Sequence, residues 1–339
     1  MTALPLVAIT AGDPAGIGTE VALRTLALPD SHLACRPVIY GSATAVRRDL
    51  GWLGLDLEIV SVGPGEAPER TDNHHVHVRD LDEEGDTPVG LGELCAMGGE
   101  LAVRAVRAAV TDALEGRIDA MCTAPLNKEA MWLAGHEYDG HTGLLTEMCG
   151  GTPTSMLLVG ERLRVAHVTT HVAFEDVPGR LSVQRIADVI RIAGETMRSL
   201  GFDQPRIAGA GLNPHSGEHG LFGSQEGTII GPAIEQARTD GWDVTGPVSP
   251  DAVFIQMLED RHDIVVAMYH DQGHIPVKII EFDRAVNISG GLPIIRTSVD
   301  HGTAFDIAGT GRARTENMEV ALAHAARMAS NRRRDEAGR

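Results

Sequence analysis

The chain has 339 residues, of which 43% are hydrophobic and only 4% aromatic, and its formal charge at pH 7 is −18. This length suits two domains, and the scarcity of aromatic side chains predicts aliphatic cores. The acidic balance argues against nonspecific nucleic-acid binding, which needs a basic surface, so any anionic ligand must be attracted locally. The four cysteines lack CxxC spacing and no apolar run approaches membrane-spanning length, so we expect a cytoplasmic protein with reduced thiols.

Short β-branched segments alternate with longer amphipathic segments, a pattern that predicts an α/β protein with mostly parallel strands. Strands are expected at 6–10, 37–41, 57–62, 118–123, 155–159, 164–169, 206–211, 263–268, 286–288 and 294–298. Helices are expected at 17–28, 94–115, 144–149, 183–200, 227–240 and 316–331. Because no clean linker interrupts the chain, we expect a terminal domain of 1–130 plus 286–339 and an inserted middle domain of 131–285.

The first strand is joined to the first helix by the segment Gly-Asp-Pro-Ala-Gly-Ile-Gly at 12–18. It is similar to a nucleotide-binding glycine turn, but its spacing is not GxGxxG, and Pro14 removes a backbone donor that a phosphate loop would use. We therefore expect a tight functional turn and assign no residue to dinucleotide binding.

Only two of the 29 basic side chains are lysines, Lys128 and Lys278. Lysine is a compact point charge, whereas arginine is a larger planar fork. Both lysines lie in segments rich in polar residues, so we interpret both as residues of a site. The alternative is a composition bias that left two surface lysines by chance.

Two sets of residues are suited to an anionic ligand. Gly-His-Thr-Gly at 140–143 is expected to open a helix that Thr142 could cap, and helix N-termini bind anions; a capped turn alone is the alternative. Further along, Arg296 can bind a carboxylate or phosphate bidentately, Lys278 adds a point charge, and Asn287 adds a neutral hydrogen bond.

Three histidines, His171, His215 and His270, each follow a buried-looking strand. Ligands bind at this edge of open α/β sheets, and catalytic transition-metal sites often use three protein ligands with one open position. The three are candidate ligands of one divalent metal, or else separate hydrogen-bonded structural histidines. Asp251 and Asp271 are candidate acid–base or outer groups, although Asp251 follows Ser-Pro and could be a helix cap.

Six segments follow in order along nearly the whole chain. They are Gly-Asp-Pro-Ala-Gly-Ile-Gly at 12–18, Gly-His-Thr at 140–142, Thr-Thr-His at 169–171, Leu-Asn-Pro-His-Ser-Gly-Glu at 212–218, Tyr-His-Asp-Gln-Gly at 269–273 and Gly-Leu-Pro-Ile-Ile-Arg-Thr-Ser-Val-Asp-His-Gly-Thr-Ala at 291–304. Together they resemble the PdxA family, the 4-hydroxythreonine-4-phosphate dehydrogenases. The resemblance implies a fold like isocitrate and isopropylmalate dehydrogenases, and a homodimer with its site in an interdomain cleft at the subunit interface.

By matching motif positions, the resemblance implies a divalent ion (zinc, cobalt, magnesium or manganese) on His171, His215 and His270. It implies a substrate-binding set of His141, Thr142, Lys278, Asn287 and Arg296. Lys278 and Asp251 are the expected catalytic groups. The implied reaction is NAD- or NADP-dependent oxidation of the C3 hydroxyl of 4-phosphooxy-L-threonine to a 3-keto acid that decarboxylates, as in pyridoxine biosynthesis.

Some residues depart from the usual pattern of the family. Thr19 and Gly143 stand where proline and glutamate are common, and Thr-Ala-Pro-Leu-Asn-Lys at 123–128 looks like paralogues acting on 4-phospho-D-threonate or 4-phospho-D-erythronate in sugar-acid catabolism. These acids are the alternative substrates. The histidine set would equally serve a metal-dependent hydrolase or aldolase, in which the ion would activate water. A noncatalytic ligand-binding protein of two α/β domains is the third possible class.

Overall fold

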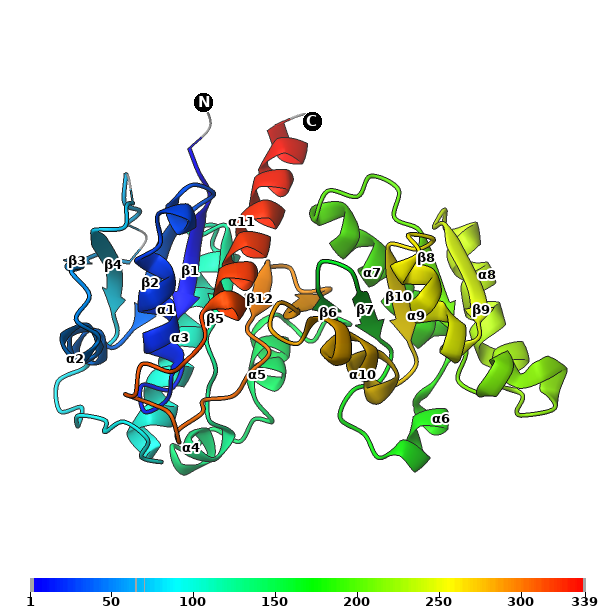
Figure 1. Cartoon of the computed structure of the whole chain (residues 1–339), viewed down its shortest axis with the longest axis horizontal. Helices are drawn as coiled ribbons and strands as arrows, with labels where there is room; N and C mark the ends of the chain where they lie inside the picture. Colours follow the sequence, from blue (N-terminus) through cyan, green and yellow to red (C-terminus); the bar gives the residue numbers. More distant parts are fainter. Residues whose placement is uncertain (1–2, 65, 70, 338–339) are drawn as a thin grey trace. The chain divides into compact units, whose positions relative to one another are not determined.

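The computed structural model describes residues 3–64, 66–69 and 71–337 (Figure 1). The chain divides into two compact units, Met1–Thr152 with Leu292–Arg339, and Pro153–Gly291. The first boundary thus falls later than the expected 130/131, because α4 (Lys128–Leu133) packs tightly on α3 (Ala96–Leu114) of the first unit. A β-carbon on Gly99 of α3 would lie 2.1 Å from the carbonyl oxygen of Ala130. The second boundary falls after β11 rather than at the expected 285/286.

In the first unit the strands lie in the order β3-β4-β2-β1-β5-β12, and all neighbours are parallel. The strands are β1 (Leu6–Thr10), β2 (Arg36–Gly41), β3 (Glu58–Ser61), β4 (His75–Asp80), β5 (Ala120–Thr123) and β12 (Arg296–Ser298). Besides α3 and α4, the helices are α1 (Gly18–Leu26), α2 (Ala43–Leu53), α5 (His141–Met148), α11 (Glu316–Ala337) and the 3-10 turn η1 (Pro29–His32).

The core of the first unit is aliphatic, as the composition predicts. Leu6 and Ala8 of β1 point to the same face because strand side chains alternate, and they pack with Val103 and Val106 of α3. Helix α11 packs against β1, β5 and β12, so helices cover both faces of the sheet (Figure 1). Strand β1 is buried along its whole length, which is usual for a parallel strand between two helical layers.

In the second unit the strands lie in the order β11-β6-β7-β10-β8-β9. Strand β6 is antiparallel to both of its neighbours, and the other pairs are parallel. The strands are β6 (Ser155–Val159), β7 (Arg164–His167), β8 (Ile207–Ala210), β9 (Val244–Val248), β10 (Ile264–Ala267) and β11 (Val286–Gly290). The helices are η2 (Phe174–Asp176), α6 (Val177–Arg180), α7 (Val183–Ser199), η3 (Pro214–Gly220), η4 (Glu226–Ile230), α8 (Gly231–Thr239), α9 (Pro250–Leu258) and α10 (His270–Glu281).

The predicted α/β alternation is confirmed, but sequence patterns did not predict several helices, among them α9 and α10. Helix α10 contains Gly273 and Pro276, both unfavourable inside helices, so its sequence looks like a loop. Tertiary packing overrides this preference, since Val277 of α10 is buried in the core beside β7 and β10. Within the described part of the chain, no helix combines the length and apolarity needed to cross a bilayer.

Candidate functional site

The three predicted metal-binding histidines follow three adjacent strands of the second unit. Strand β10 pairs in parallel with β7 on one side and with β8 on the other. His171 lies beyond the end of β7, His215 beyond β8, and His270 begins α10 after β10. Because parallel strands end at one edge, all three segments emerge at the edge where α/β sheets bind ligands.

His171 and His270 lie close together, with ring centroids 5.6 Å apart. The Nδ1 atom of His270 lies 2.7 Å from Oδ1 of Asp271, which leaves Nε2 as the nitrogen available to a ligand. A carboxylate on the far ring nitrogen is the usual support for a metal-binding histidine. The donor chemistry of this pair therefore suits a divalent transition metal.

His215 lies in a strained turn. His215, Ser216, Glu218 and His219 all have φ between 41° and 54°, in the left-handed region that costs about 1–2 kcal/mol per non-glycine residue. Such strain persists only where the surroundings enforce it, and it is common at functional sites.

Glu226 is one of the groups that hold this turn. Its Oε1 accepts hydrogen bonds from the backbone N–H of Leu212 at 2.8 Å and of Asn213 at 2.7 Å, and its Oε2 accepts one from Nδ2 of Asn213 at 2.9 Å. Burial alone would raise the pKa of Glu226, but these hydrogen bonds outweigh it and lower the pKa. The carboxylate therefore stays ionised and fixes the chain just before His215.

Among residues 3–64, 66–69 and 71–337, no three His, Cys, Asp or Glu side chains gather as a group able to hold a metal ion. His215 lies near Asp251, an exposed residue in the first turn of α9. A hydrogen bond from the Ser249 hydroxyl, and to a lesser extent the charge of His215, lower the pKa of Asp251. The structure thus brings His171 and His270 together, and the three-histidine centre stays a prediction.

Two buried histidines, His167 and His274, support His270 and were missed by sequence reasoning. The ring of His274 stacks on that of His270, with centroids 3.7 Å apart and planes 12° apart. His274 Nδ1 lies 3.1 Å from His167 Nε2, and His167 Nδ1 lies 3.0 Å from the carbonyl oxygen of Met156. Because a carbonyl only accepts, His167 carries its proton on Nδ1 and accepts at Nε2 the proton of His274 Nδ1.

Both supporting imidazoles are neutral near pH 7. Burial, with smaller contributions from neighbouring imidazoles, lowers the pKa of His167 to about 4 and that of His274 to about 3. A sequence signal existed, because His270, His274 and Lys278 recur at intervals of four and share one face of α10. This spacing is informative only if the segment is helical, and Gly273 and Pro276 make its sequence look like a loop.

The first unit contains a separate group suited to anions. Arg296 begins β12, is only 4% exposed, and donates from Nη2 to the Thr123 hydroxyl at the end of β5 at 2.7 Å. His141 begins α5, and its buried Nε2 has no hydrogen-bond partner among the described residues. Burial and the Arg296 charge hold the pKa of His141 well below its usual range.

Burial lowers the pKa of Arg296 to about 10, so its guanidinium stays charged at neutral pH. A buried cation beside a neutral imidazole with an unsatisfied nitrogen is chemically suited to bind a carboxylate or phosphate.

The expectation that Thr142 caps the helix is wrong. Helix α5 begins at His141, two residues before the Gly143 start that a Thr142 cap would require, and its N-cap is Gly140, which has φ 129° and no side chain to cap with. Thr142 is exposed in the first turn. The predicted helix start at 140–143 is otherwise confirmed.

The other predicted substrate-binding residues, Lys278 and Asn287, belong to the second unit. Lys278 is exposed on α10, two turns beyond His270. Asn287 lies in β11, opposite Leu158 of β6. Of the predicted substrate-binding residues, His141, Thr142 and Arg296 therefore belong to the first unit, and Lys278 and Asn287 belong to the second.

The glycine turn after β1 is tight, as predicted. A β-carbon on Gly12, which has φ 72°, would lie 2.1 Å from the carbonyl oxygen of Pro125. The following Asp13 is buried; its Oδ1 accepts the Ala15 N–H at 2.9 Å, and its Oδ2 has no partner among the described residues. Burial raises the pKa of Asp13 to about 6, against the smaller lowering effect of the Ala15 hydrogen bond.

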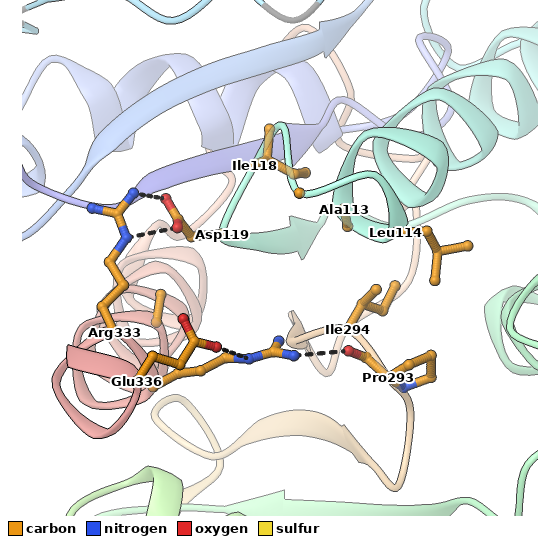
Figure 2. Close-up of a pocket in the computed structure, with 11 residues that line it drawn as sticks. Ala113, Leu114, Ile118, Asp119, Pro293, Ile294, Arg333 and Glu336 are labelled. Carbon is orange, nitrogen blue, oxygen red and sulfur yellow. Dashed lines mark hydrogen bonds and ion pairs between the residues drawn. The ribbon is translucent and has the colours of Figure 1, made fainter. Parts of the chain in front are cut away.

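A cavity of about 340 Å³ lies at the other end of β5 (Figure 2). Arg333 of α11 bridges both oxygens of Asp119 there, at 2.6 and 2.7 Å, and Oδ2 of Asp119 also accepts the Leu6 N–H. No predicted site residue lines this cavity. We interpret the Asp119–Arg333 pair as the connection that ties α11 to the sheet.

The family described as "Pyridoxal phosphate biosynthetic protein PdxA" matches residues 33–325 of this chain. A D-threonate 4-phosphate dehydrogenase of Salmonella typhimurium is 46% identical, over 95% of this chain and 98% of its own. A 4-hydroxythreonine-4-phosphate dehydrogenase of Trichlorobacter lovleyi is 43% identical, over 98% and 99%. A crystal structure of 4-hydroxythreonine-4-phosphate dehydrogenase from Klebsiella pneumoniae superimposes with a TM-score of 0.87 at 44% identity, covering 96% and 98% of the two chains. With its fold and its motifs both matched along its length, the chain belongs to the PdxA family.

Proposed function

We propose that the protein is a nicotinamide-dependent dehydrogenase that oxidises the C3 hydroxyl of a 4-phosphorylated four-carbon hydroxy acid, 4-phosphooxy-L-threonine. The product is a 3-keto acid that decarboxylates, and NAD or NADP accepts the hydride. The observation that carries this proposal is the 42–46% identity to relatives named as dehydrogenases of such phosphorylated acids, over 95% or more of this chain.

A second substrate, 4-phospho-D-threonate or 4-phospho-D-erythronate, is favoured by two observations. The relative at 46% identity is named a D-threonate 4-phosphate dehydrogenase. Residues 123–128 also look like those of the corresponding paralogues. Either acid presents the same groups to the protein, an anionic carboxylate, a C3 hydroxyl and a phosphate.

We also propose that His171, His215 and His270 hold one divalent ion, which would be zinc, cobalt, magnesium or manganese. The 5.6 Å separation of His171 and His270, and the parallel strands that lead to all three histidines, support this assignment. When bound, such an ion would supply positive charge that lowers the pKa of a coordinated hydroxyl.

The substrate's anionic ends would be bound by His141, Thr142, Lys278, Asn287 and Arg296. Arg296 and Lys278 contribute charge, and the buried Nε2 of His141 gains a partner on binding. Asp251 and Lys278 are the proposed acid–base groups because they lie near His215 and on the His270 face of α10, respectively.

A homodimer is the proposed assembly, in the cytoplasm. Helix α10 presents an apolar stripe of Ile275, Ile279 and the adjoining Phe282, which are 55%, 75% and 69% exposed. This stripe lies on the helix that also carries His270 and Lys278, so a second copy covering it would approach the proposed site. Ile279→Glu is expected to shift the mass measured by light scattering from dimer to monomer; an unchanged dimer would refute this surface.

A panel of substrates tests the proposed activity. 4-Phosphooxy-L-threonine, 4-phospho-D-threonate and 4-phospho-D-erythronate are each incubated with NAD and with NADP, and reduced cofactor is measured by absorbance before chelation, after chelation and after adding each metal back. We expect one acid to dominate and chelation to abolish its turnover. Cofactor-independent release of phosphate would instead favour the hydrolase alternative.

His215→Ala tests the metal assignment separately. The variant should lose turnover and bound metal while keeping the circular dichroism spectrum of the wild type. Wild-type turnover and metal content in this variant would refute the ligand role of His215.

A further inference from the structure

We infer that Lys128 binds the phosphate group of the substrate, as a third member of the anion-binding group formed by His141 and Arg296. This role rests on the proposed function, because it presumes a phosphorylated substrate. Lys128 belongs to neither the predicted metal-binding nor the predicted substrate-binding set. It is one of only two lysines in the chain, and the other, Lys278, is in the substrate-binding set.

The local fold directs Lys128 to this group. Strand β5 ends at Thr123, and the chain enters α4 with Lys128 as its first residue. Asn127 is the N-cap, and its Oδ1 accepts the Ala130 N–H at 3.0 Å, which fixes the backbone beside Lys128. Lys128 therefore lies at the same carboxyl edge of the sheet as Thr123, the hydrogen-bond partner of Arg296.

The side chain of Lys128 reaches the start of α5. Its Cε atom lies 3.3 Å from the position that a β-carbon on Gly140 would take. Gly140 is the N-cap of α5 and directly precedes His141, so the ammonium, one bond beyond Cε, lies beside the backbone of the His141 turn. The absence of a side chain on Gly140 keeps this space open to the lysine stem.

The Lys128 ammonium is also available to bind a ligand. Lys128 is exposed, and within the described ranges it makes neither a hydrogen bond nor an ion pair. The nearest acidic residue before α5, Asp139, already accepts the Gly143 N–H through Oδ1 at 3.1 Å. The Lys128 ammonium thus lies beside the turn that begins with His141, whose Nε2 is unsatisfied among the described residues, and at the sheet edge where the buried Arg296 binds Thr123.

A phosphate suits this combination better than a carboxylate does. A phosphate presents three peripheral oxygens, which matches the three groups Lys128, Arg296 and His141, and it carries up to two negative charges. A flexible ammonium can follow the ligand, while Arg296 and His141 hold it in place. In a chain of charge −18, such a local cluster is needed to attract an anion at all.

The test compares Lys128→Met, which keeps the stem, with Lys128→Arg, which restores a cation. Arg47→Met removes one exposed positive charge from α2 of the same unit and is the matched control. Turnover is measured with the best phosphorylated acid of the panel, and thermal unfolding is measured with and without inorganic phosphate. The second readout needs no turnover, so it tests Lys128 even if the proposed oxidation is wrong.

We expect Lys128→Met to raise the KM for the phosphorylated acid about tenfold or more, the loss usual for one charged hydrogen bond, with little change in kcat or in the KM of the dinucleotide. Stabilisation by phosphate should weaken in this variant, return in part in Lys128→Arg, and be unchanged in Arg47→Met. An unchanged KM for the acid, or a rise confined to the KM of the dinucleotide, would overturn the inference.

Discussion

His167 and His274 are joined by a hydrogen bond of 3.1 Å between two imidazole nitrogens, although 107 residues separate them in the chain. The bond exists because Gly273, next to His274, has no side chain. A β-carbon there would lie 2.5 Å from His167 Nε2 and 2.6 Å from Cγ1 of Val165. Because α10 can approach β7 closely at Gly273, His274 bonds to His167 and also stacks on the ring of His270.

Gly273→Ala should separate α10 from β7. We expect the free energy of unfolding in urea to fall by about 1–3 kcal/mol, the usual cost of overpacking, despite the better helix propensity of alanine. Turnover should fall as well, because His270 loses its stacked neighbour. Gly227→Ala is the control, since nothing lies within 4 Å of a β-carbon at that position. Equal stability of the two variants would contradict the packing argument.

Asp13 should make stability depend on pH. Its folded pKa of about 6 lies above the ordinary value of 3.8, so folding favours the protonated form. Its stabilising contribution is complete below about pH 4 and is lost as pH rises through 6. The unfolding free energy of Asp13→Asn, compared with that of the wild type, should therefore rise by about 2–3 kcal/mol as the pH is raised from 4 to 8. Urea unfolding at each pH measures this difference.

The control for this pH experiment is Asp56→Asn, which changes an exposed carboxylate of the same unit. Its stability relative to the wild type should stay nearly constant over the same range. If the difference in unfolding free energy between Asp13→Asn and the wild type stayed constant with pH, Asp13 would have the same pKa in the folded and the unfolded chain, and the prediction would be wrong.

Glu226→Gln should loosen the left-handed turn that carries His215. The glutamine amide would direct N–H groups toward Asn213 Nδ2, a donor that now binds Oε2 at 2.9 Å. We expect a loss of about 1–3 kcal/mol in unfolding free energy, together with a lower kcat and weaker metal retention. Glu235→Gln, in an exposed pair with Arg238, should change none of these by much.

Arg296→Lys tests the buried guanidinium. Lysine keeps the charge, but it cannot bind Thr123 and a ligand with a planar fork. The KM for the phosphorylated acid should rise about tenfold or more, and Arg47→Lys on the exposed face of α2 should leave it unchanged. A wild-type KM in Arg296→Lys would show that charge alone suffices at this position.

The sequence alone determined the α/β class, the strands that lead to His171, His215 and His270, and the PdxA motifs. These features are local: a strand of four to six residues and the polar residues after it are adjacent in the chain, so their pattern is visible in one dimension. The position of each histidine at a strand's end followed from the same local pattern.

Only the tertiary structure decided which of these residues meet. The parallel registers β7–β10 and β10–β8 bring segments from 165, 207 and 265 together, and helix packing then places His167 against His274. The structure also assigned α4 and α5 to the first unit and left Thr142 without a capping role. Such contacts depend on register and on the close approach of backbones, as at Gly273 and Gly140, and no local periodicity encodes either.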